Sequence, residues 1–315
     1  MNFFKQFLKS SIGFFFRFNP FFRISLKKKL TIFVFHEVSN KQSKFLFQNN
    51  IAHTIQSFTK QINWINKNFN VISPEYLTQN KAFPDYSAVI TFDDGYLGTF
   101  DNGLKILKEK NIPAIVFINS KPLRERKPNI AAIANYLEKD NEFLRFAKEE
   151  GLESPFHLSI SPNLLKKYMK SKDSIEIENK AYLFQGEIAS IETLFQWESS
   201  NLFFYGNHLY DHWNANALSS DEFKNEYQKN EEFLSQFKNY LNLFAFTNGK
   251  PGTCFTQEHV DMLKTLSAEK VFSSSNGINR DLSGYLFGRL CTFDSDKSEN
   301  NLWFRLGVTN SRFKS

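Results

Sequence analysis

Three groups of polar residues have the side chains that metal-ion chemistry uses. Asp93 and Asp94 stand side by side before a glycine, His208 and His212 are four residues apart, and His36 stands alone. Two histidines at this spacing can face one ion from a helical turn or from a loop folded around it. Together with one carboxylate they form a site that holds a divalent cation and leaves positions open for water and substrate. The pattern therefore predicts a metal centre.

Each group taken alone also has an ordinary structural interpretation. Asp-Asp-Gly can form a hairpin turn, a His-x-x-x-His pair is unspecific, and a histidine at a strand end is often only hydrogen-bonded. The turn is disfavoured because a helical pattern, rather than an alternating strand, follows Gly95. We assign no role to the three remaining histidines, which are His53, His157 and His259.

Each polar group follows a short apolar run that predicts a buried strand. The pairs of strand and polar group are 30–35 with His36, 88–92 with Asp93 and Asp94, 201–205 with His208 and His212, and 243–246 with Asn248. In a barrel of parallel strands the carboxyl ends of all strands open on one face, and catalytic groups collect there. We therefore expect these side chains to meet.

Helical patterns separate the strands and indicate an α/β fold with a largely parallel sheet. Residues 54–69, for example, carry apolar side chains at spacings of three and four, which is typical of a helix with one buried face. Residues 120–187 interrupt the alternation: they contain four prolines, a helical stretch near 130–150 and a candidate strand at 182–184. Because the alternation resumes afterwards, we interpret this segment as an insertion or lid.

The composition excludes several classes of protein. A chain of 315 residues with 41 % hydrophobic and 23 % charged residues can bury a core, which excludes disorder of the bulk. Two cysteines are too few for a disulfide framework. The net charge of +6 comes with many Lys and Asn residues, and we expect no nucleic-acid partner.

The first 29 residues form a basic, aromatic N-terminal extension. The longest run without charge, residues 10–16, is shorter than a membrane-spanning helix requires, and no cleavage site for a signal peptide follows. Mixed cationic and aromatic residues suit a helix lying in a membrane interface. The alternative is that these aromatics cover the outside of the domain. We expect a cytoplasmic protein. If the first interpretation of the N-terminal segment holds, the protein also associates peripherally with the inner face of the membrane.

Four segments carry a resemblance to a known family. Residues 91–95 (TFDDG) resemble the first motif of polysaccharide deacetylases of carbohydrate esterase family 4, which share the NodB-homology domain. Residues 206–212 (GNHLYDH) resemble the second motif, and residues 244–249 (FAFTNG) occupy the place of the third. The strand that ends at His36 resembles the opening of the circularly permuted poly-N-acetylglucosamine deacetylase subgroup. The resemblance covers about residues 30–120 and 188–295.

The resemblance implies a fold and a metal site. The fold is a distorted (β/α)7 TIM-like barrel over residues 30–315, with the insertion at about 120–187. Asp94, His208 and His212 would bind one divalent cation, with Zn²⁺ as the expected metal. Asp93 would stay off the metal and act as the general base.

The resemblance also implies roles for three further positions. His36 would protonate the departing amine. Asn248, or a backbone N–H beside it, would bind substrate and hold the oxyanion. Arg280 or Arg289 would orient Asp93 or bind substrate, and we place Arg289 among the substrate-binding residues.

The sequence departs from the family pattern at two places. Leu209 replaces the usual Ser or Thr of the second motif, and Trp213 stands where proline is common. Thr247 and Asn248 replace Pro-Tyr in the third motif, which puts the shape of the acetyl-binding wall in question.

The predicted function is a metal-dependent hydrolase that removes an N-acetyl or similar N-acyl group from an amino sugar, in a bacterial glycan or a lipid-linked saccharide. One alternative is a relative that retains the metal and binds glycan without turnover. Another is a deformylase that acts on a lipid-linked amino sugar. A two-His-one-carboxylate set also occurs in non-haem Fe(II) oxygenases, but the alternation of strands and helices argues against their all-β frame.

Overall fold

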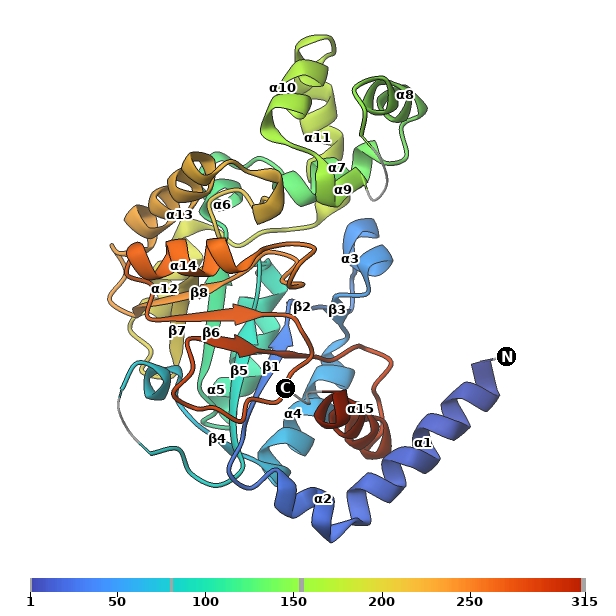
Figure 1. The fold of residues 1–315 in the computed structure, drawn as a ribbon, viewed down its shortest axis with the longest axis vertical. Helices are drawn as coiled ribbons and strands as arrows, with labels where there is room; N and C mark the ends of the chain where they lie inside the picture. The colour runs from blue at the N-terminus through green and yellow to red at the C-terminus, as the bar shows by residue number, and fades with distance from the viewer. Residues whose placement is uncertain (1, 80–81, 153–155, 313–315) are drawn as a thin grey trace.

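A barrel of parallel strands forms the centre of the computed structural model, which describes residues 2–79, 82–152 and 156–312 (Figure 1). Every strand pair in the main sheet is parallel, in the order β10-β9-β8-β7-β6-β5-β1-β11, and β4 also pairs with β5. A separate two-stranded sheet joins β2 to β3. The strands are β1 (Leu30–Phe35), β2 (Glu37–Val38), β3 (Ala52–His53), β4 (Asn70–Val71), β5 (Ser87–Phe92), β6 (Ala114–Ile118), β7 (Phe203–Asn207), β8 (Tyr240–Ala245), β9 (Lys270–Ser273), β10 (Leu286–Gly288) and β11 (Leu290–Cys291).

One residue, Arg289, closes the barrel. β10 pairs with β9 at one edge of the sheet, and β11 pairs with β1 at the other edge. Only Arg289 lies between β10 and β11, so the chain crosses from one edge to the other within a single residue. Counting β10 and β11 as one interrupted strand, the ring of described strands has seven members. The predicted distorted (β/α)7 barrel is confirmed.

The apolar runs are continuous because the strands are covered on both sides. All residues of β1, β5 and β6 are buried. One set of strand side chains, which includes Ile32, Val89 and Phe117, forms a compact cluster within the barrel. The alternate set, which includes Phe33 and Phe92, packs against the surrounding helices in the main core.

Helices surround the barrel and lengthen the connections between strands (Figure 1). Their placement agrees with the helical spacing of the sequence; Ser219, for instance, caps the predicted helix before Phe223 through a capping box with Glu222. The α-helices are α1 (Asn2–Phe18), α2 (Pro20–Ser25), α3 (Lys44–Asn49), α4 (Ile55–Asn68), α5 (Lys105–Glu109), α6 (Ser120–Glu125), α7 (Ile130–Leu137), α8 (Asn141–Glu149), α9 (Phe156–Ser159), α10 (Pro162–Lys170), α11 (Ser174–Gln185), α12 (Ile191–Glu198), α13 (Ser220–Leu234), α14 (Gln257–Thr265) and α15 (Glu299–Arg312). The shorter helical turns are η1 (Pro74–Leu77), η2 (Thr99–Leu104, a π-helix) and η3 (Ala215–Ala217).

Residues 120–187 form a helical projection between β6 and β7. Helices α7 to α11 stand together at the top of Figure 1 and have an apolar cluster of their own, built on residues such as Leu137, Phe143 and Tyr168. The prediction of a strand at 182–184 is wrong, because these residues lie in α11. A three-residue apolar run fits one turn of a helix as well as a strand, and contacts of α11 with α7 and α3 decide the outcome here.

Helices α1 and α2 precede the barrel, and α1 packs along α15 at the opposite end of the chain (Figure 1). Among the described helices, none combines the length and the hydropathy that crossing a membrane requires.

Candidate active site

The turn after β5 presents Asp93 and Asp94 at the carboxyl end of the barrel. Asp94 and Gly95 have φ values of 73° and 81°, a left-handed conformation that is unusual for an aspartate and marks a tightly constrained turn. Both carboxylates are buried. The helical segment that follows the turn, rather than a returning strand, excludes the hairpin interpretation.

His208 and His212 come from a loop and not from a helical turn. The pairing of β7 with β8 shifts in register between Tyr205 and Asn207, immediately before His208. Such an irregularity re-aims the residues that follow it. Asn207 Oδ1 then accepts a hydrogen bond from Leu209 N at 2.9 Å, and His212 has a φ of 55°. The loop is therefore held in a defined, non-helical shape that turns both imidazoles inward.

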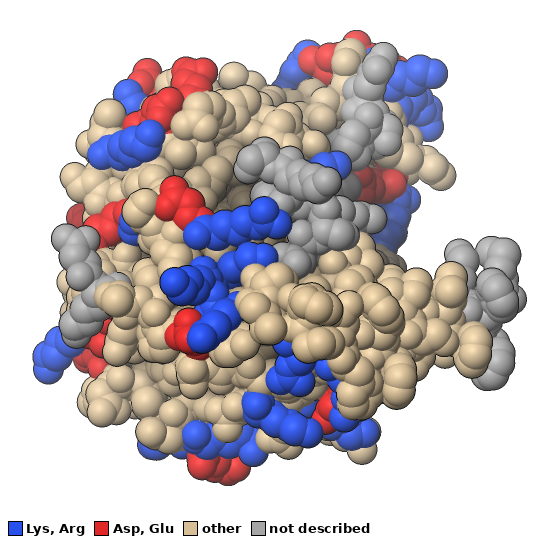
Figure 2. Space-filling model, turned by 60° about the horizontal axis from the view of Figure 1, so that its bottom comes forward, with Lys and Arg blue, Asp and Glu red and all other residues tan. Residues whose placement is uncertain are grey.

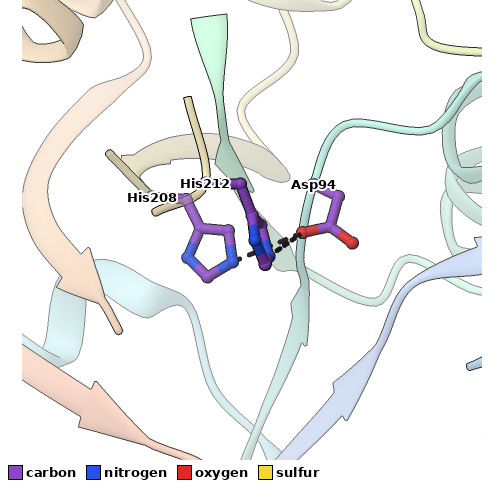
Figure 3. Close-up of side chains that lie close together, drawn as sticks. All are labelled: Asp94, His208 and His212. Carbon is purple, nitrogen blue, oxygen red and sulfur yellow. Dashed lines mark ion pairs between the residues drawn. The ribbon is translucent and has the colours of Figure 1, made fainter. Parts of the chain in front are cut away.

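Asp94, His208 and His212 converge on one point (Figure 3). Asp94 Oδ1 lies 3.4 Å from His208 Nε2 and 3.1 Å from His212 Nε2, and one ligand atom from each residue lies within 4.8 Å of the others. His208 Nδ1 lies 2.7 Å from the carbonyl oxygen of Ala245. In the tautomer with its proton on Nδ1, His208 donates a hydrogen bond to this carbonyl, and Nε2 is free to bind an ion.

These three residues fit a divalent cation. Asp94 Oδ1 is fully buried and accepts no hydrogen bond from any described residue, a costly state for a carboxylate that a cation would relieve. Burial would raise the pKa of Asp94, but the neighbouring His212 and His208 hold it well below its ordinary value. Burial likewise opposes the charge on His212, yet Asp94 raises the pKa of that imidazole. Two imidazoles and one carboxylate are a donor set typical of catalytic zinc.

Asp93 is held by Arg289. Arg289 Nη1 donates to Asp93 Oδ1 at 2.6 Å, and Nη2 donates to Oδ2 at 2.8 Å. Arg289 also donates to Thr91 Oγ1 at 3.3 Å, and only 1 % of the residue is exposed. Burial would raise the pKa of Asp93, but Arg289 reverses the effect and lowers it. Asp93 is therefore ionised and fixed in orientation beside the three converging side chains.

His36 lies beside Asp93. Its Nε2 is 4.0 Å from Asp93 Oδ2, and the side chain is 22 % exposed. Burial lowers the pKa of His36, and the nearby Asp94 and Asp93 offset this only in part. At neutral pH the imidazole is thus mainly uncharged.

A cleft of about 270 Å³ joins these groups and opens to solvent. It is lined by His36, Asp93, Asp94, His208, His212, Asn248 and Arg289, which are the seven site residues that the sequence predicted. Asn248 has a φ of 56°, and among the described residues its backbone N–H has no hydrogen-bond acceptor. Arg280, by contrast, is exposed and does not line the cleft.

The sequence analysis missed the part that other segments play in the cleft wall. Asn129 and Asn135 reach it from the beginning and the body of α7, and Asn49 reaches it from the end of α3. No local signal marked these asparagines, because each stands in an ordinary helical context. The segment 120–187 thus contributes a wall of the cleft.

Two of the departures from the family pattern, Trp213 and Thr247, contact one another. Thr247 Oγ1 donates a hydrogen bond to the carbonyl oxygen of Trp213, and Trp213 packs with the apolar cluster of the helical projection. Trp213 and Thr247 therefore connect the loops that follow β7 and β8.

Comparisons with known proteins bear on the family and the fold of this chain. The family model for polysaccharide deacetylase matches residues 80–268. No curated protein matches the chain significantly. Among solved structures, the deacetylase PplD of Streptococcus pyogenes, solved in complex with acetate, has a TM-score of 0.59 at 14 % identity, over 89 % of this chain and 99 % of that one.

Two further solved structures have the same fold. IcaB from Ammonifex degensii has a TM-score of 0.56 at 16 % identity and covers 88 % of this chain and 97 % of its own. The de-N-acetylase from Aggregatibacter actinomycetemcomitans has a TM-score of 0.55 at 14 % identity, over 88 % of this chain and 99 % of its own. With more than half of its length matched by the family model, the chain belongs to the polysaccharide deacetylase family and is an amidohydrolase that acts on carbon–nitrogen bonds other than peptide bonds.

Proposed function

We propose that this protein removes the N-acetyl group from an amino sugar of a glycan, with a zinc ion held by Asp94, His208 and His212. The observation that carries the proposal is the convergence of these three side chains in a cleft that also contains an ionised, oriented carboxylate, Asp93. A cation at this place lowers the pKa of bound water from 15.7 toward about 7 and polarises the amide oxygen of the substrate.

Asp93 acts as the general base. Arg289 occupies one side of both carboxylate oxygens, while Oδ2 also faces the cleft, 3.9 Å from His208 Nε2 and 4.0 Å from His36 Nε2. The lowered pKa of Asp93 keeps it ionised, so it can accept the proton of the attacking water. Its neighbour Asp94 points its Oδ1 at the two histidines instead.

His36 delivers a proton to the leaving amine. Because its lowered pKa leaves it mainly neutral at the start, it must receive a proton during the reaction. Asp93, whose Oδ2 is 4.0 Å from His36 Nε2, is placed to pass on the proton that it has taken from water. Amide cleavage needs this proton, since without it the nitrogen would have to leave as an amine anion, which is too basic.

The reaction also requires that the oxyanion be stabilised and the sugar be bound, and we assign these roles to Asn248 and to the asparagines of the cleft wall. The backbone N–H of Asn248 has no acceptor among the described residues and belongs to a residue at the cleft, so it is available to an oxyanion. Asn49 and Asn135 use their amide Nδ2 within their own helices, to the carbonyls of Phe45 and Ala131. Their amide oxygens remain to accept hydrogen bonds from sugar hydroxyls.

The test is acetate release from N-acetylglucosamine oligomers by the purified protein. We expect release in the presence of Zn²⁺ and its loss after chelation, with recovery when metal is restored. The Asp93→Asn protein is the matched control, because it retains the three metal-binding side chains. Metal binding without acetate release from any acetylated amino sugar, by a protein shown to be folded, would instead support the non-catalytic alternative.

A further inference from the structure

Helices α1 and α2 carry an uncovered apolar face. On α1 the exposed large side chains are Phe7, Leu8, Phe14, Phe15 and Phe18, and on α2 they are Phe21 and Ile24. Isolated exposed hydrophobic residues are common, but seven of them on two successive helices indicate an interaction surface.

The opposite face of α1 is already docked on α15. A Cβ atom at Gly13 would lie 1.8 Å from the carbonyl oxygen of Asn300, and one at Gly307 would lie 2.2 Å from the ring of Phe16. The two helices therefore approach as closely as glycine permits. Arg17 also pairs with Glu299 at 2.8 Å. The exposed phenylalanines therefore do not pack on the rest of the protein, because α1 contacts α15 through its opposite face.

The same segment is strongly basic. The first 36 residues contain seven Lys and Arg residues, at positions 5, 9, 17, 23, 27, 28 and 29, and no Asp or Glu. Lys9, Arg23 and Lys28 are exposed and have no ion-pair partner in the described part of the chain. Figure 2, with the bottom of the molecule turned forward, shows blue basic groups beside an arm that extends to the right and whose described surface is tan in this view.

We propose that α1 and α2 dock the protein on the surface of an anionic phospholipid bilayer. Phenylalanines between cationic side chains are typical of helices that lie in the interface plane, with the rings among the acyl chains and the charges at the headgroups. A second copy of the chain is a poorer occupant, because a symmetric contact would bring two basic surfaces together. The proposal holds whatever the cleft hydrolyses, since none of these residues lines it.

The aromatic contribution is tested by sedimentation of the full-length protein with vesicles of phosphatidylcholine and phosphatidylserine. Phe18→Gln/Phe21→Gln removes two rings that are 61 % and 82 % exposed. Ile175→Gln/Leu183→Gln on α11 is the matched control, because those side chains are 69 % and 81 % exposed. We expect the first variant to bind at least about ten-fold more weakly than wild type, since burial of a phenylalanine is worth more than that factor. The control is expected to bind as wild type does.

The electrostatic contribution is tested by Lys9→Gln/Arg23→Gln/Lys28→Gln on the same vesicles. Each basic residue near an anionic surface strengthens binding about five-fold, so the triple variant should lose on the order of a hundred-fold. Lys148→Gln/Lys166→Gln/Lys238→Gln removes the same charge from exposed lysines elsewhere and is expected to lose far less. Wild-type binding should also fall with salt and on pure phosphatidylcholine.

Two results would overturn the proposal. One is equal sedimentation of wild type and both N-terminal variants. The other is concentration-dependent dimerisation of wild type, measured by analytical ultracentrifugation, that Phe18→Gln/Phe21→Gln abolishes while vesicles bind neither protein. Unchanged thermal unfolding of the variants would establish that either result concerns the surface and not the fold.

Discussion

Arg289 grips both carboxylate oxygens of Asp93, at 2.6 and 2.8 Å, from the single position that joins the two edges of the barrel. The residue that closes the barrel therefore also orients the proposed base. Any change that opens the β10–β11 junction should disturb the base, and any change at Asp93 should leave a buried guanidinium unpaired.

Arg289→Gln is expected to destabilise the fold by about 3–5 kcal/mol, because it leaves the Asp93 carboxylate buried without its partner. It should also raise the pKa of Asp93, since Arg289 is the largest of the groups that lower it. The acid limb of the pH–activity profile would then move to higher pH. Urea unfolding and the pH dependence of kcat/KM measure the two effects. Arg289→Gln/Asp93→Asn should regain much of the stability and none of the activity; a double variant as unstable as the single one would contradict this account.

His208→Ala and His212→Ala should each lose the bound metal, because two remaining ligands hold a cation too weakly. Elemental analysis of the purified variants is the measurement. His259→Gln serves as the control, since His259 lies beside Thr256 and away from the cleft. Full metal content in His208→Ala/His212→Ala would show that the ion binds elsewhere.

Asp93→Asn should keep the metal and lose activity by roughly 10²–10⁴-fold, because an amide cannot accept the proton of water. Asp94→Asn, at the adjacent position, should lose metal as well as activity. The two variants are compared by metal content and by acetate release. If Asp93→Asn also loses its metal, the roles of the two carboxylates are exchanged.

His36→Ala should slow amide hydrolysis by roughly 10²-fold or more and leave the metal in place. An ester of the same shape should be affected much less, because an alkoxide leaves more readily than an amine anion. The measurement is a paired assay of amide and ester hydrolysis by wild type and variant. An equal loss in both reactions, or no loss in either, would make His36 a structural residue.

Glu37 should make the fold less stable as the pH rises. Burial raises the pKa of Glu37 to about 8 although Gly98 N donates to it at 3.1 Å. In the unfolded chain this carboxyl loses its proton near its ordinary pKa, so the unfolded state is favoured increasingly from about pH 5 to pH 8. Glu37→Gln should remove that part of the pH dependence and be more stable than wild type above about pH 8. Parallel unfolding curves for the two proteins across this range would contradict the prediction.

The sequence by itself was sufficient for the strands, most helices and six of the residues that line the cleft, namely His36, Asp93, Asp94, His208, His212 and Asn248. Each of these residues lies in the turn or loop after a short apolar run: His36 and Asp93 follow their runs directly, and the others come within a few residues. Such signals are local, because burial on both faces and the carboxyl end of a strand can be recognised from adjacent residues. The fold class follows from their alternation with helical spacing.

The tertiary structure alone decided which distant groups meet. Arg280 and Arg289 are equivalent in local sequence context, yet only Arg289 contacts Asp93, 196 residues away. In the same way, Phe16 packs on Gly307 of α15 while Phe14 and Phe15 stay exposed. Spacing along a chain determines which face of an element a residue occupies. Which faces and edges then come together depends on how the barrel closes and where glycine allows two backbones to approach, and both are contacts between residues far apart in the sequence.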